Sequence, residues 1–190
     1  MIRDAARDFA QTELLPGVIH RDEHQEFPAN QIKKLGELGF LGMMVDPKYG
    51  GAGMDTISYV LAIEELSKVD ASCSVVMSVN NSLVCWGLET YGNEDQKEKY
   101  LKPLAKGEMI GAFCLSEPEA GSDATSQKTT AIDKGDHYLL NGTKNWITNG
   151  ETASVYLVIA QTDIEKGYKG INAFIIEKGM PGFVVGLKEN

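Results

Sequence analysis

The stretch MIGAFCLSEPEAGSDA, from Met109 to Ala124, contains the point at which the chain changes its kind of secondary structure. Before it, apolar residues recur at helical spacing, as on the face shared by Ile2, Ala6, Phe9 and Ala10. After it, apolar runs are short, and glycine-containing turns separate them, which is typical of strands. Helices followed by strands, without interleaving, predict an α+β protein.

Two domains are expected: an all-helical domain over residues 1–108, followed by an antiparallel β-barrel or sandwich domain over residues 109–190. The strands are expected to be antiparallel, because parallel strands need crossover connections, which are usually helices, and none is interleaved here. The chain finishes just after an apolar, strand-like run. Some edge or face of the sheet is therefore expected to be left for residues outside the chain.

Local signals limit the first helices. Pro16 should end the first one, because proline cannot continue a helix. A second helix is predicted from the stripe of Ile32, Leu35 and Leu38, and Gly39 should close it.

Two longer helices follow in the helical half. One is expected from the N-cap Asp55 to Val69, with so little polar face that it should be buried. The next, from Ser72 to about Tyr91, mixes apolar residues with small polar ones such as Asn80 and Asn81. Such a surface can line a pocket as well as pack against a neighbour.

The composition excludes several classes of protein. Of the 190 residues, 43% are hydrophobic and 24% are charged, which is ordinary for a folded globular chain. The formal net charge is −9 and no Lys/Arg cluster is longer than a pair, so neither nucleic acid nor a membrane is expected as partner. Neither a membrane span nor a secretory signal is expected. The three widely spaced cysteines predict buried thiols in a reducing compartment, and hence a cytoplasmic protein.

Three common kinds of site are disfavoured. His20 and His24 have the spacing of two metal ligands on a helix, but they lie in a charged segment that reads better as an exposed linker, so no metal site is expected. Ser122 is not in the G-x-S-x-G elbow of hydrolases. The segment GGAGMDT from Gly50 has no preceding strand and reads as a tight turn rather than a dinucleotide-binding loop.

Two stretches remain, FCLSEPEAGSDA (Phe113 to Ala124) and NGTKNWITNG (Asn141 to Gly150). The first crowds hydroxyl and carboxylate side chains into one loop, where Gly121 permits unusual backbone angles that aim N–H groups outward. The residues alone leave two interpretations open: a turn held by Ser and Asp side chains, or a loop that binds an anion or cofactor. A tryptophan such as Trp146 is more often a core residue than a cofactor neighbour, and here too both interpretations stay open.

Together these stretches resemble the acyl-CoA dehydrogenase family, most closely its short-chain or butyryl-CoA type. DPKYGGAGMD, AIEELSKVDAS, YGNEDQKEKYLKPLAKGE and GINAFIIEKGMPGF resemble family segments in the same order, so the resemblance covers nearly the whole chain. It implies an N-terminal helical domain, a middle β domain and a C-terminal four-helix domain in a homotetramer with FAD. This chain is expected to lack the four-helix domain.

The resemblance also implies a reaction. A carboxylate base removes the α-proton of a short-chain acyl-CoA thioester while the β-hydride passes to flavin N5, as in fatty acid metabolism. Electrons then leave to an electron-transferring flavoprotein.

The family's cofactor-binding positions fall here on Phe113, Leu115, Ser116, Gly121, Ser122, Trp146, Ile147 and Thr148. Ser116 and Thr148 match the residues that donate to the flavin rim, and Trp146 matches the aromatic packed along the ring. Ser122 matches a residue near the flavin pyrophosphate that also binds substrate. The helix over residues 78–83 corresponds to the wall of the acyl pocket.

The chain departs from the family pattern in two ways. Glu119 stands where the family usually has glycine, and a positive φ there would strain the loop. The family's catalytic glutamate lies in the absent domain, so no catalytic residue is assigned. Two alternatives stay open: a non-catalytic fragment of this fold that binds flavin or CoA, and a flavoprotein of this fold with oxidase or monooxygenase chemistry.

Overall fold

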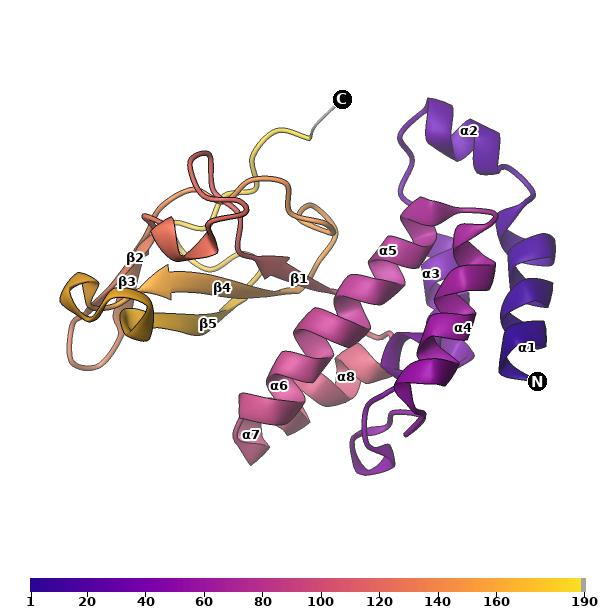
Figure 1. Ribbon diagram of the computed structural model, residues 1–190, viewed down its shortest axis with the longest axis horizontal. Coiled ribbons are helices and arrows are strands. Elements are labelled where there is room, and N and C mark those ends of the chain that lie inside the picture. Colours follow the sequence, from indigo (N-terminus) through magenta and orange to yellow (C-terminus); the bar gives the residue numbers. More distant parts are fainter. Residues whose placement is uncertain (189–190) are drawn as a thin grey trace. The chain divides into compact units, whose positions relative to one another are not determined.

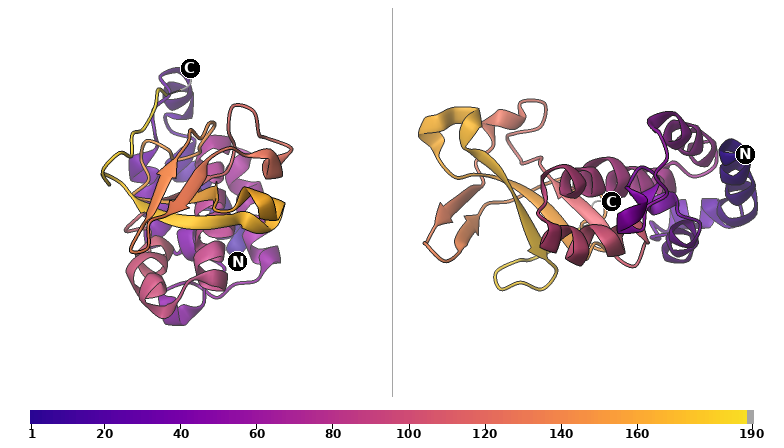
Figure 2. Two further views of the ribbon diagram at one scale, coloured as in Figure 1. Left: turned by 90° about the vertical axis from the view of Figure 1, so that its left-hand side faces the viewer. Right: turned by 90° about the horizontal axis from the view of Figure 1, so that it is seen from below.

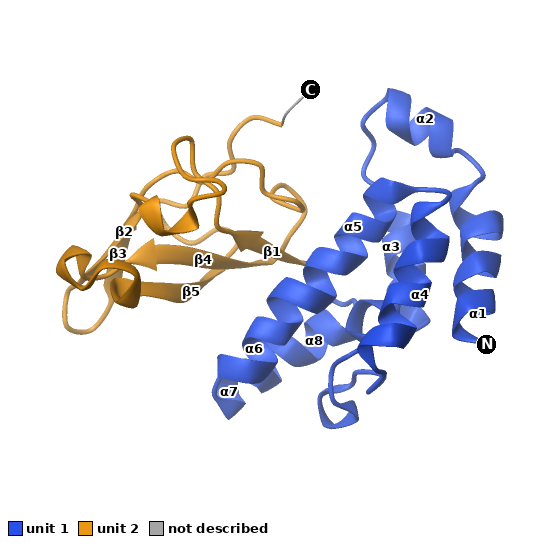
Figure 3. Ribbon diagram, in the orientation of Figure 1, with its two compact units in different colours: residues 1–110, 190 blue, residues 111–189 orange. Residues whose placement is uncertain are grey.

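The structure is a computed structural model that describes residues 1–188. The chain folds into two compact units, a helical one over Met1–Ile110 and a sheet-containing one that begins at Gly111 (Figures 1 and 3). The prediction of a helical part followed by a strand-containing part is confirmed.

The helical unit contains helices of different lengths, labelled in Figure 1, and some of them continue through π-helical turns. Helix α1 (Ile2–Phe9) continues into a π-helical turn at Ala10–Leu14, and α2 (Val18–Glu23), α3 (Ala29–Glu37) and α4 (Thr56–Ser67) follow. Helices α5 (Ala71–Ser78) and α6 (Trp86–Tyr91) form one rod with the π-helical Val79–Cys85 between them. Helices α7 (Glu94–Gln96) and α8 (Lys102–Ala105) are joined in the same way through Lys97–Leu101. The 3-10 turns are Phe40–Gly42 and Pro47–Tyr49.

The predicted apolar face of α1 is confirmed, because Ala6, Phe9 and Ala10 are buried in the core of the helical unit. The predicted stripe of α3 is right only in part. Leu38 is 60% exposed, because α3 ends at Glu37 and the chain then turns away.

Helix α4 begins as predicted but is not buried all round. The Asp55 carboxylate accepts a hydrogen bond of 2.8 Å from the Ser58 backbone N–H, as an N-cap does. Ile57 and Val60 are 70% and 53% exposed, so the expectation of a buried helix is wrong. The helix packs against α1 and α5, which leaves a third face at the surface.

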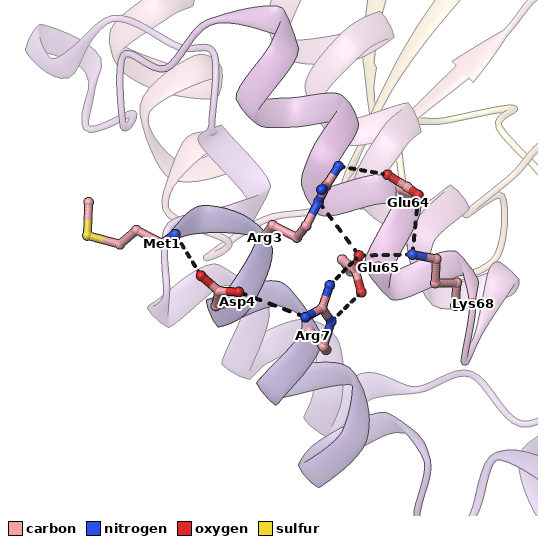
Figure 4. A network of polar contacts seen from close by, with 7 residues as sticks. All are labelled: Met1, Arg3, Asp4, Arg7, Glu64, Glu65 and Lys68. Atoms are coloured by element: carbon pink, nitrogen blue, oxygen red, sulfur yellow. Dashed lines mark hydrogen bonds and ion pairs between the residues drawn. The ribbon is translucent and has the colours of Figure 1, made fainter.

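One charged residue of α4 lies inside. Figure 4 shows Glu65, only 4% exposed, between Arg7 of α1 and Lys68 of its own helix. Arg7 Nε and Lys68 Nζ each lie 2.9 Å from the carboxylate. Their hydrogen bonds, that from Arg7 first, lower the pKa of Glu65 to about 2.

The rod over Ala71–Tyr91 is long and apolar enough, by length and composition alone, to cross a membrane, with a mean hydropathy of 1.2. That result differs from the expectation that no stretch approaches a span. Half of the 18-residue stretch with this hydropathy is buried inside the protein, and a core helix passes the same test.

The strands form a mixed sheet rather than an antiparallel one. They are β1 (Gly111–Cys114), β2 (Thr130–Asp133), β3 (Tyr138–Asn141), β4 (Val155–Gln161) and β5 (Ile171–Glu177), and a further 3-10 segment covers Ile164–Gly170. The order is β1-β4-β2-β3, and β5 pairs with β4 along their whole length (Figures 1 and 2). Pairs β2–β3 and β4–β5 are antiparallel, whereas β1–β4 and the contact of β2 with β4 are parallel.

The error has a physical reason. The connection from β1 to β4 consists of two loops and the β2–β3 hairpin, which is long enough to bring the chain back for parallel pairing without a helix. A helical crossover is common but not required.

The three cysteines behave as predicted. Cys73, Cys85 and Cys114 are free thiols in buried positions. Burial raises the pKa of Cys73 and Cys114 to about 12, so neither is reactive at neutral pH.

Candidate functional site

The two sequence motifs become two loops beside strand β1. The first loop, residues 115–129, follows β1 and leads to β2; the second, residues 142–154, leads from β3 to β4. At one end of the strand, the Asn145 backbone N–H donates to the Ser116 carbonyl over 2.9 Å. At the other end, Asn149 Nδ2 donates to the Gly111 carbonyl over 3.0 Å. Residues 145–149 are therefore attached to the first residue of β1 and to Ser116, two residues beyond its end.

This arrangement brings six of the eight predicted cofactor residues to one edge of the sheet. They are Phe113, Leu115, Ser116, Trp146, Ile147 and Thr148, and all but Trp146 are half-buried. The side-chain hydroxyls of Ser116 and Thr148 have no protein partner within residues 1–188. Both hydroxyls are thus available as donors to a ligand.

Gly121 and Ser122 are not brought into this group. They lie at the exposed tip of the first loop, above an antiparallel bridge between Glu117 and Ala120. Gly121 does not have a positive φ, and an added Cβ would meet open space, so the loop does not use the backbone freedom that this glycine permits.

The backbone strain that a positive φ at Glu119 would cause is absent as well. This residue has no positive φ, and its carboxylate lies 3.8 Å from Lys128 Nζ. The tip is instead shaped by Asp123, whose carboxylate accepts hydrogen bonds from the Thr125 and Ser126 hydroxyls. Those hydrogen bonds, that of Ser126 first, lower the pKa of Asp123. The turn interpretation therefore holds for this part of the motif.

Trp146 is not a core residue. It is 72% exposed and its backbone has φ of 60°, a region that non-glycine residues rarely occupy. Asn149 also has a positive φ, of 66°. Such conformations cost about 1–3 kcal/mol and persist where the surroundings impose them, often at ligand sites. An exposed indole in a strained backbone adds little to the core, so its placement favours a binding role.

Buried groups hold the second loop in this shape. Tyr156 of β4 donates through its hydroxyl to the carbonyls of Gly150 and Ala153, over 2.9 and 3.0 Å. The Gly150 N–H closes a turn onto the Ile147 carbonyl, and a Cβ at Gly150 would lie 2.9 Å from that oxygen. Only glycine fits this turn without a shift.

Lys144 of the second loop and Glu117 of the first join the two loops, and the sequence analysis assigned a role to neither. Lys144 Nζ donates to Glu117 Oε1 over 2.7 Å, to Gln127 Oε1 over 2.9 Å and to the Leu115 carbonyl over 3.0 Å. Only 9% of the Lys144 side chain and 3% of the Glu117 side chain are exposed. The sequence signal that could have indicated this pair was the presence of a glutamate in the first motif and a lysine in the second.

Glu117 is held as a carboxylate by its surroundings. Burial alone raises its pKa, but the Lys144 ammonium and the backbone N–H groups of Lys128 and Thr129 outweigh this and hold the pKa of Glu117 at about 2. The group is therefore negative throughout the neutral range.

The polar face of the α5–α6 rod has a structural explanation. Asn81 donates to the carbonyls of Phe40 and Met77 and accepts from the Met43 N–H, over 2.8 to 3.0 Å. Asn80 donates to the Leu41 carbonyl, and both asparagines are at most 1% exposed. These two side chains fasten the 40–43 turn, and the expectation that the helix over residues 78–83 forms a wall of the acyl pocket stays a prediction.

Comparison with known proteins identifies the family. The family model for the acyl-CoA dehydrogenase N-terminal domain matches residues 1–108, and that for the middle domain matches residues 112–190. The chain belongs to the acyl-CoA dehydrogenase family.

Its relatives are longer proteins. This chain is 48% identical over 189 residues to the short-chain specific acyl-CoA dehydrogenase of Clostridium acetobutylicum. The match covers 100% of this chain and 50% of that relative. The solved butyryl-CoA dehydrogenase of Megasphaera elsdenii is 44% identical, with a TM-score of 0.94, over 100% of this chain and 50% of the other. The chain thus spans about half the length of the relatives it matches.

A third comparison concerns the cofactor. The glutaryl-CoA dehydrogenase of Mycobacterium smegmatis, solved in complex with FADH2, is 40% identical, with a TM-score of 0.91, over 96% of this chain and 46% of the other. FAD is the cofactor of this family. The free hydroxyls of Ser116 and Thr148 and the exposed Trp146 ring fit it, because a flavin offers polar rim atoms and a flat apolar face.

Proposed function

We propose that the complete protein oxidises short-chain acyl-CoA thioesters to their α,β-unsaturated products, with this chain supplying one wall of the flavin site. The observation that carries the proposal is the attachment of residues 145–149 to Gly111 of β1 and to Ser116 just beyond its end. It gathers two unpartnered hydroxyls and an exposed tryptophan, residues that contribute little to folding, at one edge of the sheet.

The residues would divide the work as follows. Bound FAD would supply the acceptor for the hydride that leaves the β-carbon. Ser116 and Thr148 would donate hydrogen bonds to the rim of the ring system, where negative charge develops on reduction. Trp146 would lie along the ring and exclude water, with Phe113, Leu115 and Ile147 as its apolar surroundings.

Ser122 and Gly121 would act at a distance from the ring. Both lie at the exposed tip of the first loop, where a hydroxyl and backbone N–H groups can reach the pyrophosphate of FAD and the thioester substrate. The base that takes the α-proton is assigned to the C-terminal helical domain of the complete protein.

The resemblance also supports proposals about context. Electrons would pass to an electron-transferring flavoprotein, the complete protein would be a homotetramer, and it would work in the cytoplasm in fatty acid metabolism. The three buried, free thiols are consistent with a reducing compartment.

A substitution at Thr148 tests the site. In the full-length protein, Thr148→Val should weaken flavin binding or slow flavin reduction by about ten- to hundredfold, since a hydrogen bond to a charged partner is worth about 1.5–3 kcal/mol. The matched control is Thr143→Val, because Thr143 is an exposed threonine of the same loop. It should leave both quantities unchanged.

The readouts are FAD content and bleaching of the flavin absorbance by butyryl-CoA. Unchanged values in Thr148→Val would remove Thr148 from the site. If the wild-type protein produced hydrogen peroxide instead of passing electrons to an external flavoprotein, its function would be that of an oxidase.

A further inference from the structure

The ammonium group of Lys144 is fully used. A lysine has three N–H donors, and Lys144 meets three acceptors, the Leu115 carbonyl, Glu117 Oε1 and Gln127 Oε1, over 2.7 to 3.0 Å. With 9% of its side chain exposed, the group is largely withdrawn from solvent, so these three acceptors take the place of hydrating water. Its position is therefore fixed.

Glu117 is equally saturated and closes the first loop on itself. Its Oε1 also accepts the Thr129 backbone N–H over 3.0 Å, and its Oε2 accepts that of Lys128 over 2.6 Å. One carboxylate thus ties residue 117 to residues 128–129, the two ends of the exposed tip.

The contacts flank the proposed flavin donors. Lys144 binds the residues on both sides of Ser116, namely Leu115 through its carbonyl and Glu117 through its carboxylate. The next residue after Lys144, Asn145, bonds to Ser116 itself. Two attachments one residue apart set the register of the second loop on the first, and Thr148 lies three residues beyond them.

A purely stabilising role explains this arrangement poorly. Apolar residues of similar volume usually stabilise a buried site at least as well as an ion pair does, because the ions lose their hydration. What a saturated pair adds is a single permitted geometry.

We propose that Lys144, held by Glu117, is a positioning residue that sets the spacing of the Ser116 and Thr148 hydroxyls toward the flavin rim. This inference rests on the proposed function, but it makes a separate prediction. Loss of the pair should change the binding and the redox equilibrium of the flavin even where the protein remains folded.

The test uses the full-length protein with FAD and three variants. Lys144→Met leaves the Glu117 charge buried without its cation and can prevent folding. The double variant Glu117→Gln/Lys144→Met removes both charges at nearly constant volume, and a glutamine oxygen can still accept the backbone N–H groups. Gln127→Met is the mildest, since it removes one of three acceptors together with an amide nitrogen that is buried without a partner.

The measurements are the FAD dissociation constant, the midpoint potential of the bound flavin and the melting temperature. In the double variant we expect FAD binding to weaken at least tenfold. We also expect a tenfold weaker preference for reduced flavin, which makes the potential about 30 mV more negative for a two-electron couple. Gln127→Met should change both in the same direction by less.

The matched control is Arg21→Met in the helical unit. Arg21 and Asp70 form another buried pair, at 3.0 Å with 9% and 7% of the side chains exposed. This variant should lower the melting temperature and leave the dissociation constant and potential of the flavin as in the wild type.

The outcomes separate the two proposals. Folded variants at Lys144 and Gln127 with unchanged flavin binding and potential would overturn the positioning role. A double variant that does not fold would also overturn it, because the pair would then belong to the fold. A wild-type protein that binds no FAD would refute the proposed function instead.

Discussion

Each unit of this protein buries one arginine or lysine against a carboxylate, and the two pairs serve different surroundings. In the helical unit, Arg21 contacts Asp70 at 3.0 Å and donates to the Leu14 carbonyl over 2.6 Å. In the sheet unit, Lys144 contacts Glu117 at 2.7 Å. Both cations are only 9% exposed.

The difference lies in what each pair connects. Arg21 binds carbonyls at the end of the first helix, and Asp70 caps α5 by accepting the Cys73 N–H. Helices are already held by their backbone hydrogen bonds, so the Arg21–Asp70 pair only joins the end of the first helix to the start of α5. The loops beside β1 have no such regular set of backbone bonds, and side-chain hydrogen bonds have to supply their shape. The comparison teaches that buried charge in an irregular segment indicates a site more strongly than buried charge at helix ends.

The largest effect is expected at the helical pair. Arg21→Met should destabilise the helical unit by about 3–5 kcal/mol, because it leaves Asp70 buried without its cation. Chemical denaturation measures this change. Lys102→Met, which removes an exposed contact with Glu98 at 2.7 Å, should change stability by at most about 1 kcal/mol. Equal effects of the two substitutions would contradict the comparison.

A smaller loss of stability is expected at Asn81, whose neutral side chain bonds to backbone groups of the 40–43 turn. Asn81→Leu should cost about 1–3 kcal/mol, since it leaves the Met43 N–H and the Phe40 carbonyl buried without partners. Ser82→Ala, one position along the same rod, should cost less, because Ser82 bonds only to the Ser78 carbonyl. Thermal unfolding followed by circular dichroism distinguishes them.

The sheet pair predicts a pH dependence. The pKa of Glu117 is lowered from its ordinary value of 4.5 to about 2 in the folded protein, so its contribution to stability is complete above pH 4.5 and is lost as the pH falls toward 2. The slope is at most about 1.4 kcal/mol per pH unit for one such group. Unfolding free energies between pH 5 and pH 2 should fall less steeply in Glu117→Gln. An unchanged slope would show that Glu117 does not titrate in this window.

The smallest effect on stability is expected on the exposed side of α4. Ile57 and Val60 lie three residues apart, hence on one helix face, and both are more than half exposed. The double substitution to serine should change stability by no more than about 0.5 kcal/mol but should reduce binding of a hydrophobic dye to the chain. Dye binding to the unsubstituted chain that is no higher than to a compact monomer would contradict this expectation.

Much of the fold followed from local patterns. Helical periodicity placed Ala6 and Phe9 inside, and Asp55 caps its helix as its position before the apolar run indicated. These features depend on neighbours within one or two turns. Leu38 and Ile57, which obey the same periodicity, are exposed because no element packs over them.

In the candidate site, too, some features follow from local sequence and others depend on which segments meet in space. Which residues meet a flavin stays a prediction from the family resemblance, whereas the proximity of Ser116 and Trp146 follows from pairing between loops that are distant in sequence. The parallel pairing of β1 with β4 was missed, since nothing local distinguishes a hairpin crossover from a helical one. Lys144 was missed because a lysine in a polar loop looks solvated until its three acceptors are in place.

The sequence by itself determined the succession of helices and strands, the buried thiols and the chemical character of the two motif loops, because periodicity, side-chain polarity and glycine content act within a few residues. Only the tertiary structure decided the mixed sheet, the exposure of Trp146 and the burial of Lys144 against Glu117. Those outcomes depend on which segments meet in space. A charged side chain is stable inside only where distant parts of the chain provide its partners.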